Sequence, residues 1–256
     1  MKKSFILRSI ILVIAVSLLT GQAHAEETVI KKSKPYKKNL QTRIVKKIAL
    51  PKGYHEGLFY DEKYIWVANG QGIGTWIIDP DTGSIVSRIE PVGTFTEGIA
   101  EADKGFLWVT DWDDKKLYRV TIDKEQMVIE NEFSLEPARP TGVVRVGDLT
   151  YVITWTRGMG TKYHLLELDL TGKILREVRI NDIHEPAHLT WDGKHIWITS
   201  WYSQQVYKID LDTFTILGDF KSPAAKTTGI AWDGKYLWVT GTYAGLYQVE
   251  VIDSTE

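Results

Sequence analysis

Short runs of apolar, β-branched and aromatic residues alternate with polar turns along this chain from about residue 43 onward. The clearest example is residues 228–251, where three such runs occupy residues 229–232, 236–240 and 245–251. Runs of this length and composition favour buried β-strands over helices. We therefore expect an all-β fold built from short strands.

The same unit recurs upstream, which makes this a repeat protein. Its copies, spaced 41 to 46 residues apart, begin at Gly57, Gly98, Gly142, His188 and Gly229. A period of about 40 to 45 residues with four short strands in each unit is the signature of β-propeller blades. The spacing predicts five blades, with the first strand of each blade lining a central channel.

The last unit has no fourth strand of its own after residue 251. Upstream of the first unit, residues 43–50 (RIVKKIAL) form a strand-like run that has no neighbour in sequence to pair with. If this run is the outer strand of the last blade, it closes the ring and covers two sheet edges that would otherwise be bare. The prediction is a five-bladed β-propeller over residues 43–256, closed by an N-terminal strand.

Residues 1–25 have the pattern of a secretory signal peptide. Basic residues precede an apolar run at residues 10–19, and the small residues Ala23 and Ala25 follow it. The apolar run is shorter than the roughly 20 residues that a membrane-spanning helix needs. We therefore expect cleavage after Ala25, a periplasmic or secreted mature protein and no membrane span.

Composition adds an acidic body and a basic arm to this picture. The sequence has 256 residues, no cysteine and a formal net charge of -2, which excludes thiol catalysis and thiolate metal sites. Residues 31–47 carry eight basic residues and no acidic one. We expect residues 26–42 to be a solvated basic linker, with contact to an anionic surface as the alternative. A folded body with excess acid does not have the basic surface of a nucleic-acid binder.

Two glutamates are expected to face the mouth of the channel. The residues that precede the five opening positions converge there, and two of them are Glu56 and Glu97. Carboxylates held close in a narrow channel raise each other's pKa, so Glu97 can act as a general acid or base near neutral pH. The alternative is that both are solvated or cation-bridged acids of a wet channel. Thr141 occupies the corresponding position of the third unit.

Aromatic residues are expected around the same mouth, at the ends of the second strands. Trp112, Trp155 and Trp201 occupy these positions, with Thr242 at the equivalent place in the last unit. Aromatic walls around acids suit an organic amine or a peptide. His188 replaces an opening glycine and can offer a hydrogen bond inside the channel. The predicted ligand contacts are Glu56, Trp112, Thr141, Trp155, His188, Trp201 and Thr242, with Glu97 as the catalytic candidate. No metal or cofactor is expected, and we expect a monomer.

Residues 184–188 (HEPAH) match the zinc-protease pattern HExxH. That chemistry requires both histidines on one face of a helix. Here the motif contains Pro186, lies between two predicted strands and has no helical periodicity around it. We interpret the match as coincidental.

With the five units aligned, the chain resembles the glutamine cyclotransferase family of plants and bacteria. The last unit carries GIAWD, LWVTG and LYQVEV, similar to the family's GIAWD, LFVTGK and LYEI, and Glu97-Gly98-Ile99 resembles the family's EGL. The resemblance implies a five-bladed propeller that closes N-terminal glutamine to pyroglutamate and releases ammonia. It also implies that Glu97 is the proton shuttle between the α-amine and the leaving ammonia.

Three other polar positions of that family's site hold different residues here. Glu56, Ala187 and Thr242 stand where the family has glutamine, asparagine and lysine. Cyclisation needs groups that hold the side-chain amide and polarise its oxygen. The sequence therefore supports a propeller that binds a peptide or amine, with an active glutaminyl-peptide cyclotransferase as the alternative. A third hypothesis is a lyase of the streptogramin-inactivating sort, which shares a D-G-x-x-W-[VI]-T pattern but has more blades than this chain supplies.

Overall fold

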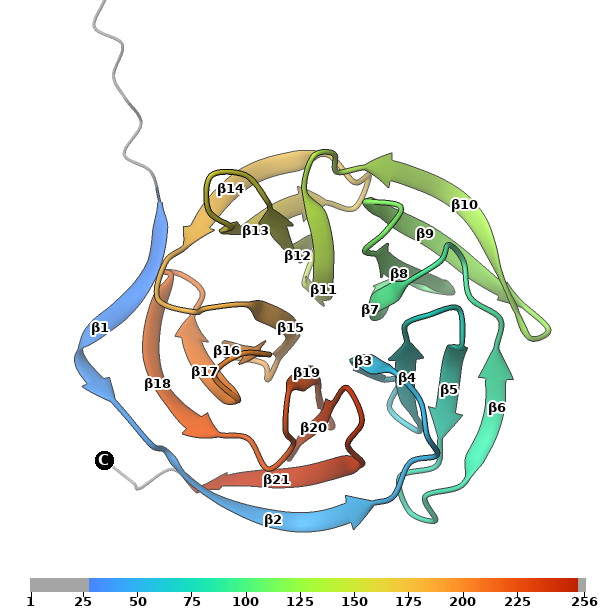
Figure 1. Ribbon diagram of the computed structural model, residues 1–256, viewed down its shortest axis with the longest axis horizontal. Helices are drawn as coiled ribbons and strands as arrows, with labels where there is room; N and C mark the ends of the chain where they lie inside the picture. Colours follow the sequence, from blue (N-terminus) through green and yellow to red (C-terminus); the bar gives the residue numbers. More distant parts are fainter. Residues whose placement is uncertain (1–27, 253–256) are drawn as a thin grey trace, which may run out of the picture.

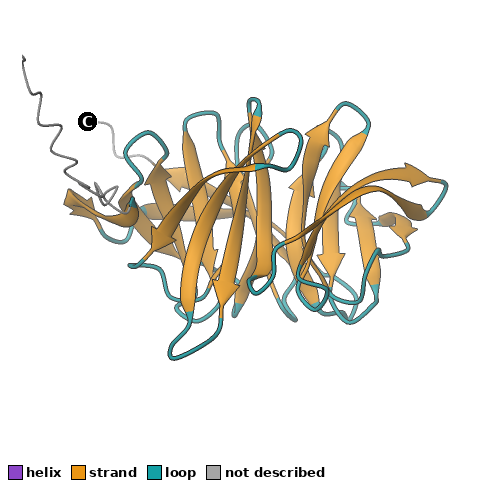
Figure 2. Ribbon diagram, turned by 90° about the horizontal axis from the view of Figure 1, so that it is seen from above, coloured by secondary structure: helices purple, strands orange, loops and turns teal. Residues whose placement is uncertain are grey.

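The computed structural model describes residues 28–252, which fold into 21 β-strands and no helix. Figure 1 shows the strands arranged as a ring of sheets around a common centre, and Figure 2 shows the same ring from its side. No helix in these residues is long and apolar enough to cross a membrane. The predicted all-β fold is confirmed, whereas the predicted signal peptide lies outside the described residues.

Three of the sheets contain four strands each. In each of them, one strand lies near the centre of the ring and the others follow outward (Figure 1). The first sheet is β3 (His55–Tyr60), β4 (Ile65–Asn69), β5 (Gly74–Ile78) and β6 (Ile85–Ile89); the second is β7 (Thr96–Asp103), β8 (Phe106–Asp111), β9 (Lys116–Asp123) and β10 (Gln126–Ser134); the third is β19 (Thr227–Trp232), β20 (Leu237–Gly241), β21 (Leu246–Ile252) and β2 (Gln41–Ile48).

The fourth sheet has nine strands, because the N-terminal strand β1 joins two four-stranded halves. β1 (Val29–Lys37) pairs in parallel with the outer strand of each half, β14 (Ile174–Ile180) and β18 (Thr215–Lys221) (Figure 1). One half is β11 (Arg139–Val146), β12 (Leu149–Thr156), β13 (Lys162–Asp169) and β14 (Ile174–Ile180), and the other is β15 (Pro186–Trp191), β16 (His195–Ser200), β17 (Gln205–Asp210) and β18 (Thr215–Lys221).

The course of β1 differs from the solvated linker that its basic composition suggests. Ile30 is fully buried in a core cluster shared by both halves of the sheet, and Tyr36 packs against the same cluster. Lys31, Lys32 and Lys34 are exposed. Two apolar side chains therefore bury β1 against the core. Its backbone pairs with the sheet edges on either side, which would otherwise have unpaired backbone groups.

Strand β2 pairs antiparallel with β21, which is the predicted pairing of the N-terminal strand with the last unit. Ile48 lies opposite Leu246, and both are buried in one core cluster. On the exposed part of the pair, Arg43 lies opposite Glu250 and donates a hydrogen bond to its carboxylate. A strand from the N-terminal part of the chain therefore completes the last sheet.

A turn aspartate anchors the second strand in three of the units. Asp61, Asp192 and Asp233 each accept the indole Nε1–H of the tryptophan five residues later, at 2.7, 2.7 and 2.8 Å. The other carboxylate oxygen of each aspartate accepts backbone N–H groups of the same turn. The spacing D-x-x-x-x-W thus fixes a turn and orients a large side chain with one carboxylate.

Opening glycines bring the inner strands into close contact. A Cβ atom on Gly57 would lie 2.6 Å from the backbone oxygen of Glu97, and one on Gly142 would lie 2.5 Å from the Cα of His188. Real side chains do not tolerate such contacts, so these glycines let one inner strand pack directly on the next. The inner strands β3, β7, β11, β15 and β19 contact one another in succession around the ring.

Candidate functional site

A cavity of about 370 Å³ opens at one end of the ring, where the residues before the five opening positions converge. All five of those residues line it, as the strand register predicts. Six of the eight predicted site residues are in its walls: Glu56, Glu97, Trp112, Thr141, Trp155 and Trp201. The other two, His188 and Thr242, are buried and do not line it.

Glu56 and Glu97 form a carboxyl pair in this cavity. Glu56 is only 5% exposed, and Glu97 is partly exposed. Burial is the largest cause that raises the pKa of each group, and the charge of Glu97 raises that of Glu56 further. Burial together with Asp111 and Asp113 raises the pKa of Glu97 to about 8. A hydrogen bond between the two carboxyl groups raises the pKa of Glu56 and lowers that of Glu97. Glu56 therefore keeps its proton at neutral pH, whereas Glu97 gains and loses a proton close to neutral pH.

Three tryptophans wall the cavity, and their indoles are held by specific contacts. Trp112 and Trp155 meet edge to face, with ring centroids 5.3 Å apart. The Nε1–H of Trp155 donates to the carbonyl of Pro186 at 2.7 Å. The Nε1–H of Trp201 donates to the hydroxyl of Thr242 at 3.3 Å. Thr242 therefore supports a wall tryptophan and does not line the cavity itself.

Two further aromatic residues, Tyr54 and Phe95, line the cavity. Their rings meet edge to face with centroids 5.4 Å apart. Neither is among the predicted site residues, because the loops that lead into the inner strands have no periodic pattern. Each lies two residues before one of the paired carboxylates, so the chain carries the spacing aromatic-x-Glu-Gly twice. This repeated spacing is the signal that identifies them.

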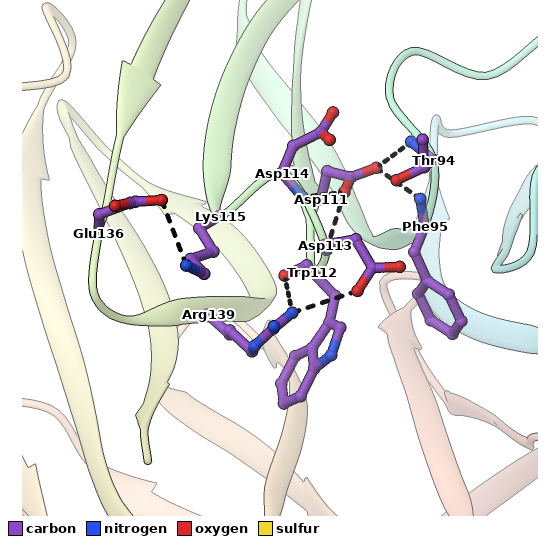
Figure 3. A network of polar contacts seen from close by, with 9 residues as sticks. All are labelled: Thr94, Phe95, Asp111, Trp112, Asp113, Asp114, Lys115, Glu136 and Arg139. Atoms are coloured by element: carbon purple, nitrogen blue, oxygen red, sulfur yellow. Dashed lines mark hydrogen bonds and ion pairs between the residues drawn. The ribbon is translucent and has the colours of Figure 1, made fainter. Parts of the chain in front are cut away.

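A network around Asp111 fixes the loops that carry Phe95 and Trp112 (Figure 3). The buried carboxylate of Asp111 accepts the backbone N–H groups of Thr94 and Phe95, at 2.8 and 2.7 Å. The backbone N–H of Trp112 donates to the carbonyl of Phe95 at 3.0 Å. Main-chain contacts therefore hold two aromatic walls of the cavity in place.

Two arginines lie over the ring of Trp112. The guanidinium carbons of Arg139 and Arg157 are each 5.2 Å from its centroid. Arg139 donates to the carbonyl of Trp112 at 2.8 Å and to the carboxylate of Asp113 at 3.2 Å (Figure 3). Arg157 is exposed and lines the cavity. One arginine is thus tied to the protein, while the other presents its charge at the opening.

Glu185 lines the cavity as well, beside the carboxylates of Glu56, Glu97 and Asp113, and is not among the predicted residues. It lies in the turn before β15 with a φ of 49°, and its Oε2 atom is buried without a hydrogen-bond partner among the described residues. His184 is exposed beside two tyrosine rings, whereas His188 is buried on β15. The HExxH pattern thus spans a turn and a strand. Within residues 28–252, no group of three or more His, Asp or Glu side chains is arranged to hold a metal ion.

His188 packs the centre of the ring. Its Nδ1 lies 3.2 Å from the carbonyl oxygen of Ile230, and a Cβ atom on Gly57 would lie 2.6 Å from its Nε2. Burial lowers the pKa of His188 to about 4, so the imidazole is neutral at physiological pH. The side chain therefore fills space between inner strands, which explains why it does not line the cavity as predicted.

Comparison with known proteins adds a fold likeness to this geometry. No protein-family model matches the chain, and no curated protein is a significant match in sequence. In structure, the chain is similar to glutaminyl cyclase from Myxococcus xanthus, with a TM-score of 0.69 and 17% identity over 85% of this chain and 100% of that one.

Two other solved structures are more distant. A chain of a nidogen/laminin complex gives a TM-score of 0.55 at 16% identity, over 76% of this chain and 74% of that one. A streptogramin B lyase gives 0.50 at 15% identity, over 84% and 98%. At these identities the likeness concerns the fold alone. The glutaminyl-cyclase-like β-propeller fold implied by the sequence resemblance is therefore confirmed.

Proposed function

We propose that this chain is a five-bladed β-propeller whose cavity binds the amino group of a peptide or of a small amine. The count of 21 strands, the four-stranded units and the circle of contacting inner strands support the number of blades. The likeness to a glutaminyl cyclase supports the same architecture. The chemistry of the cavity supports the ligand class.

The observation that carries the proposal is a carboxyl pair inside an aromatic enclosure. An ammonium group placed beside Glu56 and Glu97 favours their ionised forms, because its positive charge offsets the repulsion between the two carboxylates. The indole of Trp155, over which no cation of the described residues lies, adds cation–π attraction, worth about 0.5–2 kcal/mol depending on how far the ligand cation is desolvated. Trp112 and Trp201 add apolar surface to the enclosure. The amino end of a ligand therefore finds both a charge partner and an apolar enclosure.

Proton release on binding tests this proposal. Because the pKa of Glu97 is about 8 in the free protein, an arriving ammonium ion drives the pair to ionise and releases a proton at pH 7. Calorimetric titration with X-Ala dipeptides, where X is leucine, phenylalanine or glutamine, in buffers of different ionisation enthalpy measures that release. We expect Glu97→Gln to lower the number of protons released and to weaken binding about tenfold.

The controls are an exposed carboxylate and a blocked ligand. Glu130→Gln removes an exposed glutamate of β10 and leaves both quantities unchanged. Trp201→Ala weakens binding without changing the number of protons released. Equal binding of N-acetylated dipeptides, or no binding of any dipeptide, would refute an amine site.

The second candidate function is cyclisation of N-terminal glutamine. The pKa of Glu97, about 8, suits a group that alternates between base and acid near neutral pH. In this reaction the α-amino nitrogen bonds to the side-chain amide carbon, and the bond from that carbon to the amide nitrogen breaks. Glu97 takes the proton from the amine and gives it to the departing nitrogen, which leaves as ammonia.

Ammonia release from Gln-Ala distinguishes the two functions. A catalyst releases ammonia at a rate that Glu97→Gln lowers by about 100-fold or more. A binding protein binds Gln-Ala and releases ammonia no faster than buffer does. Ammonia release that is the same in the wild-type protein and the Glu97→Gln variant excludes the catalytic candidate.

We also propose that the protein is exported. The basic residues, apolar run and small residues of positions 1–25 support it. Fractionation of cells that produce the full chain is expected to place a product beginning at Glu26 outside the cytoplasm. Uncleaved chain in the cytoplasm alone would contradict export.

A further inference from the structure

We infer that the ligand of this cavity is a zwitterion, an amino acid or a short peptide with a free carboxylate, whose anionic end lies by Arg157 and Lys226. The inference rests on the proposed amine site and concerns the opposite end of the ligand. It depends on how charge changes from the buried to the exposed part of the cavity. The buried part holds the carboxyl pair, whereas Arg157 lines the exposed part and Lys226 lies over the ring of the wall residue Trp201.

Arg157 is the first of these cations. It follows strand β12 directly, two residues after Trp155, and its side chain lines the cavity in an exposed position. Its guanidinium carbon lies 5.2 Å from the centroid of the Trp112 ring. Among residues 28–252, no carboxylate forms an ion pair with it. A planar guanidinium held against an aromatic face keeps its N–H groups for a carboxylate of a ligand.

Lys226 is the second cation and lies beside another wall. Its Nζ is 4.8 Å from the centroid of the Trp201 ring. The backbone carbonyl of Lys226 accepts the N–H of Thr242 at 3.2 Å, and the hydroxyl of the same threonine accepts the indole N–H of Trp201. Thr242 thus holds both the backbone of Lys226 and the indole of Trp201. The ammonium group of Lys226 is exposed and has no carboxylate partner in the described part of the chain.

The acids near these cations do not neutralise them. Asp113 is exposed at the cavity, but it pairs with Arg139 at 3.2 Å. Glu185 also lines the cavity, and its Oε2 atom is buried without a partner among the described residues. The carboxyl groups therefore lie in the interior or are already paired, whereas Arg157 in the exposed wall and Lys226 beside the wall residue Trp201 have no carboxylate partner among the described residues. A molecule with an amine at one end and a carboxylate at the other matches this charge order.

The test compares dipeptide acids with their C-terminal amides. Leu-Ala and Leu-Ala-amide share the amino end and differ only in the terminal charge, and neither can cyclise. We expect the acid to bind about tenfold more tightly than the amide at low salt, with a difference that shrinks as salt is added. Arg157→Gln and Lys226→Gln each reduce the affinity for the acid by about three- to tenfold and leave the affinity for the amide unchanged.

Matched controls come from the same kind of contact elsewhere on the ring. Arg176 lies over the ring of Phe214 at 4.4 Å and Lys235 over that of Tyr236 at 4.8 Å, and neither of these rings is a wall of the cavity, unlike Trp112 and Trp201. Arg176→Gln and Lys235→Gln are expected to leave both affinities unchanged. Equal binding of acid and amide overturns the zwitterion inference and leaves the amine site standing. Binding of neither peptide overturns both.

Discussion

Glu97 makes the stability of the folded protein depend on pH. Its pKa is raised from 4.5 to about 8 by burial and nearby acids, so the folded state binds this proton more tightly than the unfolded state does. The stabilisation is complete below pH 4.5 and is lost as pH rises towards 8. The charge partner that a ligand needs is therefore a source of instability when the cavity is free.

The first prediction is that Glu97→Gln stabilises the free protein at alkaline pH. The variant and the wild-type protein differ least near pH 4, and at pH 8 the variant melts at least about 2 °C higher. Thermal melts at pH 4, 6 and 8 measure the difference. Glu130→Gln, on the exposed face of β10, shows no such trend. A gap between variant and wild type that stays constant with pH would contradict the raised pKa.

The second prediction concerns the inner-strand glycines. Gly142→Ala places a Cβ atom 2.5 Å from the Cα of His188 and 3.0 Å from the carbonyl oxygen of Ala187. Because these are main-chain atoms, the strands must separate, and we expect a loss of about 3 kcal/mol in the free energy of unfolding. Denaturant titration measures it. Gly158→Ala meets nothing within 4 Å and is expected to change stability by less than about 0.5 kcal/mol.

At the level of whole strands, a turn aspartate links the turn before the second strand to a tryptophan of that strand. Asp192, Asp233 and Asp61 hold a tryptophan in this way, but the second unit does not. There Asp103 pairs with Arg119 at 2.9 Å, and the Nε1 of Trp108 is buried without a partner among the described residues. The same spacing thus has two outcomes, depending on whether a neighbouring strand offers an arginine.

The third prediction uses this contrast. Asp192 accepts backbone N–H groups of Lys194 and His195 as well as the indole N–H of Trp197. Asp192→Ala leaves all three donors unpaired, so we expect a loss of about 2–3 kcal/mol in the free energy of unfolding. Asp103→Ala breaks one partly exposed ion pair and is expected to lose about 1 kcal/mol or less. Losses of equal size would show that the aspartate does not anchor the strand.

Strand positions were predictable because the same strand pattern occurs in all five units, so a strand that is unclear in one unit is clear in another. The opening positions Gly57 and Gly229 place a residue before them at the cavity, and both of those residues line it. The supporting roles of Thr242 and His188 were not predictable. Strand register fixes the face on which a side chain lies, but it does not fix how far that side chain is buried. Lys226 was likewise hidden, since it reaches Trp201 from a turn outside the repeat pattern.

At the scale of the molecule, the composition of β1 predicts a solvated segment, whereas the structure has a paired strand there. Its lysines indicate a solvated segment, but Ile30 and the two adjoining sheet edges decide its place. Propensity and charge describe a segment alone, whereas edge pairing depends on strands far away in sequence. The closing role of β2 was predictable because the last unit visibly lacks a strand.

The fourth prediction is that β1 stabilises the ring. Ile30→Asp puts a carboxylate into a fully buried position, so β1 is expected to detach, with a loss of about 3 kcal/mol in the free energy of unfolding. The bare edges of β14 and β18 then favour association between chains, which light scattering detects. Lys31→Asp changes an exposed neighbour and is expected to leave both measurements near wild type. A monomeric, equally stable Ile30→Asp variant would contradict this role.

The pairing of β1 and β2 also sets an order of assembly in time. Lys31 lies opposite Thr215, and Gln41 lies opposite Ile252. Among the described strands, β1 therefore has no edge to pair with until β14 has been synthesised, and β2 has none until β21 has been synthesised. Until then these two strands lack the partners that hold them in the folded ring, and the strand that pairs with β2 is the last described one to be made. The ring is a closed object only after its two ends have met.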